Sequence, residues 1–216
     1  MTGDELIAFT RQLIHESNPD FWTPINLLAS LVSAQKRLAM KMQRAAERVF
    51  YGSCVIPTVI GQKPYALPNG TLYSAAKKCM GKIDLLQYSN EPPLRKADIR
   101  TFYDTATGTP RYIAIAGDYF YLHPTPNLVM SFTCWYPYFP TAIAAGSSAI
   151  DFIDGFEPMI ALEAARMSML KEEADVSDLR YELASYWQDF KETYCGNRIE
   201  GEPDIPLSSI YEDEDL

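Results

Sequence analysis

Residues 107–136 limit the possible folds of this chain more than any other segment, because their pattern predicts consecutive β-strands. Two isoleucines alternate with alanines over residues 113–116, and Gly117 and Asp118 then supply residues that favour a turn. A run dominated by aromatic and branched residues follows over 119–122, and such residues are enriched in strands. The segment is therefore expected to form a β-hairpin.

The chain is expected to leave this hairpin at Pro124 and Pro126, because proline donates no backbone hydrogen bond and is excluded from central strands. It re-enters a sheet near Leu128, and residues 129–136 are expected to form a third strand. Val, Ser, Thr and Trp alternate there with Met, Phe, Cys and Tyr, so neither set is strongly polar. This composition favours a sheet that is covered on both faces.

The middle of the chain, residues 51–140, is expected to form an all-β module of about six short strands. Proline, glycine and β-branched residues dominate its first half. Earlier strands are expected at 54–60, 65–67, 71–80 and 83–88, and one helical turn at 98–103.

Amphipathic helices are expected on both sides of this module. Apolar residues recur at helical spacing over residues 3–16, 23–48, 155–173 and 177–194. Thr23 and Pro24 form a good start signal, and Ser177 is the expected cap of the last helix, which should stop at Gly196. Residues 142–149 carry no clear pattern and stay unassigned.

The expected fold class is α+β: a helical bundle built from the N- and C-terminal segments, with an inserted antiparallel β module and an extended C-terminal tail. The expected divisions are 1–50 for the N-terminal helices, 51–140 for the β module, 141–198 for a linker and the C-terminal helices, and 199–216 for the tail.

Composition agrees with a soluble globular protein, at 47% hydrophobic and 22% charged residues. No apolar run is long enough to cross a bilayer, and the first residues include Asp4 and Glu5 rather than a basic leader. Neither a membrane span nor a signal peptide is expected.

The net charge of −9 is concentrated at the C-terminus. Residues 199–216 hold seven of the 28 acidic residues and no Lys or Arg, so the rest of the chain balances 21 acidic against 19 basic residues. The tail also carries four apolar anchors, Ile205, Leu207, Ile210 and Tyr211. Such a segment cannot form a core alone and commonly orders on a partner.

A basic stripe lies on the second expected helix, where Arg37, Lys41, Arg44 and Arg48 recur at spacings of four, three and four. It fits a contact with nucleic acid, with an acidic peptide or with a neighbouring subunit, and it equally fits a solvated helix face. The acidic tail is one candidate partner, within one copy or between copies.

Catalytic motifs are not found in the sequence. No phosphate-binding loop, nucleophile elbow or His-Glu-x-x-His is present, and only His15 and His123 could serve as bases. Glu163 lies close to Arg166, a pattern typical of a solvated helix face. The four widely spaced cysteines favour buried free thiols over zinc or disulfides. The protein is not expected to be an enzyme or to need a cofactor, although a hydrolase or transferase without a familiar motif stays an alternative.

Tyrosines are numerous, and four of them lie close together in sequence: Tyr119, Tyr121, Tyr136 and Tyr138. They could form an exposed aromatic patch on a sheet or pack in the core, and the sequence leaves both possibilities open.

The chain resembles the head-to-tail adaptor (connector or neck) proteins of tailed bacteriophages. The resemblance rests on features that follow one another in the sequence. Gly108 and Pro110 precede a short hairpin, Leu122 and the prolines after it end the hairpin, and the next strand ends in Tyr136 and a proline. A helix that opens at 22–24 and an aromatic last helix before an acidic tail extend it over most of the chain.

The resemblance implies a structural virion protein made in the host cytoplasm and located at the head-tail junction. Such adaptors form a ring under the portal, in about twelve copies, extend the DNA channel without reading its sequence, and present a platform for tail, nozzle or fibre proteins. The tail anchors would then bind the portal, the basic stripe would meet a neighbouring subunit, and the aromatic patch would face a tail protein. The alternative is a non-catalytic protein whose β module recognises a glycan or other surface ligand.

Overall fold

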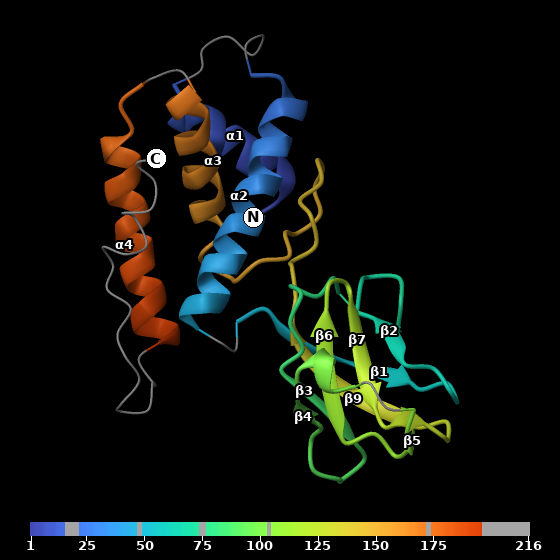
Figure 1. The fold of residues 1–216 in the computed structure, drawn as a ribbon. Helices are drawn as coiled ribbons and strands as arrows, with labels where there is room; N and C mark the ends of the chain where they lie inside the picture. The colour runs from blue at the N-terminus through green and yellow to red at the C-terminus, as the bar shows by residue number, and fades with distance from the viewer. Residues whose placement is uncertain (16–21, 47–48, 74–76, 103–104, 172–173, 196–216) are drawn as a thin grey trace.

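The computed structural model describes residues 1–15, 22–46, 49–73, 77–102, 105–171 and 174–195. These residues form helices and β-sheets that surround two separate hydrophobic cores, one helical and one within the sheets. Figure 1 shows the helices gathered at one end of the molecule and the strands at the other. The α+β class is confirmed, and the helices come from both ends of the chain with the strands between them.

The four helices are α1 (Gly3–Leu13), α2 (Pro24–Ala45), α3 (Pro158–Lys171) and α4 (Ser177–Tyr194). The predicted cap at Thr23 is present, because its hydroxyl accepts from the Asn26 N–H at 3.3 Å. The predicted cap at Ser177 is wrong: the Asp175 carboxylate accepts from the Ser177 N–H at 2.9 Å, and Ser177 is already helical.

The helical core is centred on α3, and α1, α2 and α4 each contact α3 (Figure 1). α3 is buried on almost every side, as expected for a helix enclosed by neighbours. The largest contributions come from apolar side chains that are fully or nearly fully buried: Leu6, Leu31, Leu38, Met42, Met159, Leu162, Trp187 and Phe190.

The connection from the last strand to α3, which includes the unassigned residues 142–149, packs along α1 and α2. Gln35 is completely buried, and its amide donates to the Thr141 and Asp151 carbonyls at 3.0 and 3.2 Å. The Ile143 N–H donates to the Gln35 side-chain oxygen at 3.3 Å. The N-terminal amine forms an ion pair with Glu157 at 3.2 Å. The segment is therefore part of the helical half, although it contains no helix before α3.

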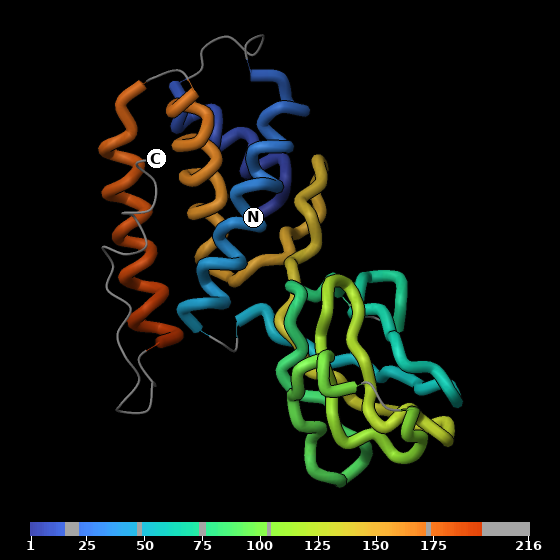
Figure 2. The backbone as a smooth tube through the Cα atoms, in the orientation of Figure 1, coloured from blue at the N-terminus to red at the C-terminus, as the bar shows by residue number. Residues whose placement is uncertain are grey.

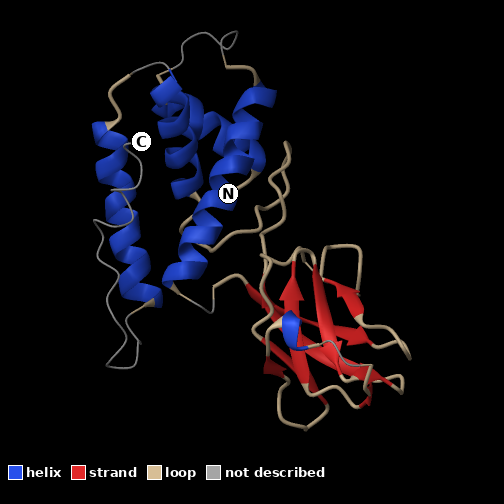
Figure 3. Cartoon of the chain, viewed as in Figure 1, coloured by secondary structure: helices blue, strands red, loops and turns tan. Residues whose placement is uncertain are grey.

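The strands make three small sheets, which Figure 3 draws in red. They are β1 (Tyr51–Pro57), β2 (Pro64–Ala66), β3 (Leu85–Tyr88), β4 (Arg95–Lys96), β5 (Thr107–Gly108), β6 (Tyr112–Ala116), β7 (Tyr119–His123), β8 (Thr125–Pro126) and β9 (Ser131–Pro137). The orders are β1-β9-β3, β2-β7-β6-β4 and β5-β8. Side chains from the two larger sheets share one core.

Several strand predictions need correction. The predicted strand at 71–80 is wrong in its described residues, where only Cys79 makes an isolated bridge, to Tyr138. The chain leaves the sheet of the hairpin after His123, as predicted, but the segment with the two prolines is not free of pairing, because β8 pairs in parallel with β5 in a separate two-stranded sheet. A second parallel pair joins β4 to β6, so short parallel pairs accompany the antiparallel strands. The one-turn helix is confirmed at Ile99–Thr101.

The third predicted strand corresponds to β9, but within this chain it is covered on one face only. Phe132, Cys134 and Tyr136 are buried in the core, whereas Ser131 is exposed and Thr133 and Trp135 are partly exposed. The prediction of a sheet covered on both faces is therefore wrong for the isolated chain.

The chain crosses between the two halves twice, once after α2 and once after β9 (Figure 2). The crossings lie side by side, because the Tyr138 N–H donates to the Phe50 carbonyl at 2.8 Å. Within the described residues, no helix combines the length and apolar character that a membrane span requires.

The hairpin between β6 and β7 turns through Gly117, whose φ of 58° lies in the left-handed region. Gly117→Ala is expected to lower the free energy of unfolding by about 1–2 kcal/mol, because an L-residue is strained there. An added Cβ would meet no atom within 4 Å, so backbone strain is the only cost. Urea unfolding checks this against Gly108→Ala, where φ is outside that region and the new methyl would make an ordinary contact with Pro124. Equal losses in both variants would contradict the prediction.

Candidate interaction surfaces

An aromatic surface lies on the outer side of β6 and β7. The register pairs Tyr112 with His123 and Ala114 with Tyr121, so alternate side chains of both strands point away from the core. Tyr119 is 49% exposed and Tyr112 is 37% exposed, while Tyr121 and His123 are partly buried. We call Tyr112, Tyr119, Tyr121 and His123 the aromatic face.

The structure does not bring the four predicted tyrosines together. Tyr136 is 1% exposed, burial raises its pKa, and its hydroxyl donates to the Lys77 carbonyl at 3.2 Å. Tyr138 lies at the junction of the two halves, with its ring 6.3 Å from that of Phe50. The predicted patch is corrected: Tyr119 and Tyr121 lie on the aromatic face, Tyr136 is core, and Tyr138 packs between the halves.

Two members of the aromatic face, Tyr112 and His123, were missed by the sequence reasoning. A two-residue turn at Gly117 and Asp118 fixes the register of the hairpin and places both residues on the face that carries Tyr119 and Tyr121. That signal was present in the sequence. The His123 ring stacks on Phe102 at 4.9 Å, a neighbour that only the tertiary fold supplies.

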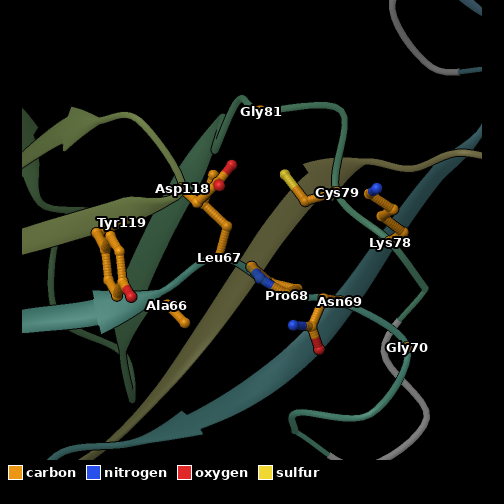
Figure 4. Close-up of a pocket in the computed structure, with 10 residues that line it drawn as sticks. All are labelled: Ala66, Leu67, Pro68, Asn69, Gly70, Lys78, Cys79, Gly81, Asp118 and Tyr119. Carbon is orange, nitrogen blue, oxygen red and sulfur yellow. The ribbon is translucent and has the colours of Figure 1, made fainter.

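A pocket of about 580 Å³ opens beside Tyr119 (Figure 4). Leu67, Pro68 and Cys79 form its apolar part, and Asp118, Lys78 and Asn69 supply polar groups. The pocket thus combines an exposed aromatic ring with hydrogen-bonding side chains at one edge of the β half.

The basic stripe of α2 is engaged within its own chain at Arg37, where the helix packs on α3. Glu163 on α3 is only 4% exposed, and it accepts two hydrogen bonds from Arg166, which is 6% exposed, both at 3.0 Å. Arg37 forms an ion pair with the same carboxylate at 3.4 Å. The expectation that Glu163 and Arg166 lie on a solvated face is wrong, because α2 covers them.

The remaining stripe residues differ in environment. Burial lowers the pKa of Lys41, and the charge of Arg37 lowers it further while Glu163 opposes the change. Arg44 is exposed, and Arg48 lies outside the described residues. The stripe is thus one side of a partly buried charge cluster, with Arg44 at its open end.

Lys77 and Asp151 form the polar link between the two halves. The Lys77 ammonium donates to both oxygens of Asp151 at 2.8 Å and lies 4.4 Å from the centre of the Tyr138 ring. The Thr141 N–H also donates to Asp151, at 2.6 Å. Beside this link, the Phe50 and Phe152 rings are 5.3 Å apart. The two halves therefore meet through one charged pair and a small aromatic cluster.

Asp151→Asn is expected to lower stability by about 1–2 kcal/mol at neutral pH, because Asn keeps the shape but loses charge-assisted hydrogen bonds in a partly exposed site. Burial alone would raise the pKa of Asp151, but Lys77 and Thr141 more than offset it and hold that pKa below its ordinary 3.8. Burial alone would lower the pKa of Lys77, but Asp151 offsets that and raises it above 10.5.

The contribution of Asp151 is therefore complete above its unfolded pKa and is lost as the pH falls through the lower folded value. The contribution of Lys77 is lost as the pH rises through its raised folded value. Chemical unfolding of wild type and Asp151→Asn at pH 7 and pH 3 checks this, with the exposed Asp154→Asn as control. A gap between wild type and Asp151→Asn that stays constant at pH 3 would be inconsistent with the linkage.

Reactive groups are sparse in the described part of the chain. Cys54, Cys79 and Cys134 are free and buried, as predicted, and Cys195 is free and partly buried. Burial raises the pKa of the Cys79 thiol, which makes it a poor nucleophile. No group of three or more potential metal ligands gathers among the described residues. The predicted tail anchors Ile205, Leu207, Ile210 and Tyr211 lie outside those residues.

Fold and surfaces together define a two-part α+β protein with a helical half, an inserted β half and an exposed aromatic surface. A family model described as SU10 adaptor protein matches residues 1–202, and the chain belongs to that family. A comparison with curated proteins found no match. Membership agrees with the resemblance to phage head-to-tail adaptors and supports an adaptor role in a phage particle. It is also consistent with a structural rather than an enzymatic protein.

Proposed function

We propose that this protein forms a ring between the portal and the tail of a phage, in about twelve copies, extends the DNA channel and carries tail proteins. The match of residues 1–202 to the adaptor family is the observation that supports this most strongly. The fold suits the role, because a helical half can form the ring wall while the β half, attached at one point, reaches a second partner.

The chain outside residues 199–216 is nearly neutral, with 21 acidic against 19 basic residues, and this supports a channel through which DNA slides. Tight binding of the phosphate backbone requires clustered basic side chains. Arg37 instead forms an ion pair with Glu163 of its own subunit. Among the described stripe residues, Arg44 is the exposed one, and we propose that it meets acidic groups of a neighbouring subunit.

The test is a pull-down of tagged full-length protein from nuclease-treated infected cells, followed by mass spectrometry and electron microscopy. Recovery of portal protein and a ring with an additional tier is the expected result. Recovery of the tagged chain without any virion component would overturn the proposal.

The tail anchors Ile205, Leu207, Ile210 and Tyr211 are proposed to bind the portal. Apolar side chains in an acidic, proline-containing segment suit docking into a groove or strand addition. A chain truncated after Ile199 should lose affinity for the portal while it retains its folded helices and sheets. Undiminished portal binding by the truncated chain would exclude this role for the tail.

The aromatic face is proposed to contact a tail, nozzle or fibre protein. Its tyrosines offer large, rigid contact area with hydroxyl groups that form hydrogen bonds. Tyr119→Ala together with Tyr112→Ala should reduce recovery of tail proteins without affecting recovery of the portal. Equal losses of both partners would indicate a general defect rather than a specific contact.

The pocket beside Tyr119 favours a second candidate function, recognition of a glycan or other surface ligand. An aromatic ring next to Asp118 and Asn69 provides the stacking and hydrogen-bonding groups that a sugar requires. Screening the purified protein on a glycan array tests this function. Specific binding that Tyr119→Ala abolishes would support glycan recognition, and an array without any signal would exclude it.

A further inference from the structure

A second exposed surface lies on the opposite side of the β half from the aromatic face. It runs along β1, β9 and the segments that continue them. The register pairs Val55 with Thr133 and Pro57 with Ser131, and the Thr58 N–H donates to the Met130 carbonyl at 2.7 Å, which extends the pairing beyond the strands. Residues that share this side are Ser53, Val55, Pro57, Val59, Val129, Ser131, Thr133 and Trp135, and we call them the valine face.

The three valines of this surface are far more exposed than side chains of their type usually are. Val55 and Val59 are each 54% exposed and Val129 is 69% exposed, while Ile60 and Leu128 extend the apolar area at the tip. In a soluble protein, the solvent-facing side of an antiparallel sheet is normally polar. A contiguous exposed apolar patch marks an interaction site.

Charge is absent from the valine face and from the sequence around it. The chain is 22% charged, yet no Asp, Glu, Lys or Arg occurs over residues 49–62 or 119–150. A charged partner would gain no ion pair here and would lose hydration. An uncharged, apolar partner surface fits best.

The backbone holds the valines in place before any partner arrives. Thr58 is 2% exposed, and its hydroxyl accepts from the Met130 N–H at 2.8 Å and donates to the Leu128 carbonyl at 3.1 Å. The Tyr65 hydroxyl accepts from the Val59 N–H at 3.0 Å. A pre-ordered surface loses less conformational entropy on binding.

Part of the β1 edge beside this surface, at Ser53 and Val55, is unpaired among the described residues. In an antiparallel ladder, every second residue of a strand forms backbone hydrogen bonds with the partner strand. Because Thr58 bonds to Met130, the even-numbered residues of β1 are the ones whose backbone groups face β9. The backbone groups of Ser53 and Val55 therefore point away from β9, and no described residue takes them up. Natural sheets protect exposed edges with charge, proline or bulges; Pro57 closes the end of this edge, whereas Ser53 and Val55 have no such protection within the described part of the chain.

We propose that the valine face is a contact surface between two copies of this chain. Permanent interfaces between identical chains are the most apolar and the poorest in charge, whereas contacts with other proteins are more polar. The inference rests on the proposed ring, in which each copy offers two different surfaces to its neighbours. Most of residues 141–149 are exposed and none is charged, although Ile143 is buried, so this segment offers a second uncharged surface on the same chain.

The test places the photoreactive amino acid p-benzoylphenylalanine at Val55 or Val129 of the full-length chain during infection. Tyr181, which is 82% exposed on α4, is the control position. Irradiation should join two copies of this chain from positions 55 and 129, and mass spectrometry of the adduct identifies the contact. Adducts only with a different protein, or none from either position, would overturn the inference.

Charge substitution gives an independent readout. Val55→Glu and Val129→Glu alter exposed side chains, so the fold should survive, as circular dichroism can verify. Each should reduce the yield of cross-linked pairs, measured from the other position, by about tenfold or more, because an unpaired carboxylate would be buried. Tyr181→Glu should have no such effect, and unchanged yields in the valine variants would contradict the inference.

The two proposals fail in different ways. If the protein is found in purified particles but its valine-face adducts contain a tail protein, the adaptor function stands and the subunit contact is wrong. If two copies are joined but no particle contains them, the contact stands and the adaptor function is wrong.

Discussion

Replacing Glu163 with glutamine is expected to destabilise the protein by about 3–5 kcal/mol, the cost of leaving a buried charge without its partner. Glu163 accepts two hydrogen bonds from the buried Arg166 and lies 3.4 Å from Arg37. Glutamine has nearly the same shape, so the loss would come from charge rather than from packing. Urea unfolding followed by circular dichroism measures it.

Two controls separate the charge effect from other causes. Glu182→Gln removes a carboxylate from an exposed site on α4 and should change stability by less than about 0.5 kcal/mol. The double variant Glu163→Met with Arg166→Met removes both charges and should recover most of the loss, because apolar replacements of buried ion pairs are often neutral. A double variant as unstable as Glu163→Gln would show that the ion pair is not the source.

Phe190→Ala is expected to cost about 3–5 kcal/mol, through lost burial and the cavity left in the helical core. Phe190 is completely buried, and its ring centre lies 5.5 Å from that of Trp187 and 5.7 Å from that of Phe156. Tyr181→Ala changes an exposed ring on the same helix and should have little effect.

Hydrogen exchange on the Phe190→Ala variant also tests the division of the chain. Because the two hydrophobic cores are separate, amides of α3 and α4 should exchange faster while those of β7 and β9 keep their protection. Equal acceleration in helices and strands would mean that both halves unfold as one unit.

Local chemistry made much of the fold predictable from the sequence. The start of α2 at Thr23 and Pro24, the turn at Gly117 and the single helical turn near Ile99 each depend on a few neighbouring residues. The α+β class followed from the change in hydrophobic period along the chain.

The wrong predictions concern burial and strand pairing, which depend on segments that are distant in the sequence. An Arg three residues after a Glu is the same pattern on an exposed or a covered helix, so only the packing of α2 against α3 shows that Glu163 is buried. Tyr136 and Tyr119 look alike in sequence, but β9 presents the former to the core. The two-residue pairings of β4 and β8 depend on strands that lie far along the chain.

The neighbouring crossings at Phe50 and Tyr138 have an evolutionary consequence. The insert begins and ends at almost the same point, so its replacement would leave the spacing between the ends of the helical half unchanged. Gene exchange among phages can then supply a new β half to an old helical half through one crossover on each side of the inserted segment. Selection on the surface of the insert could then proceed while the packing of the helical half is inherited intact.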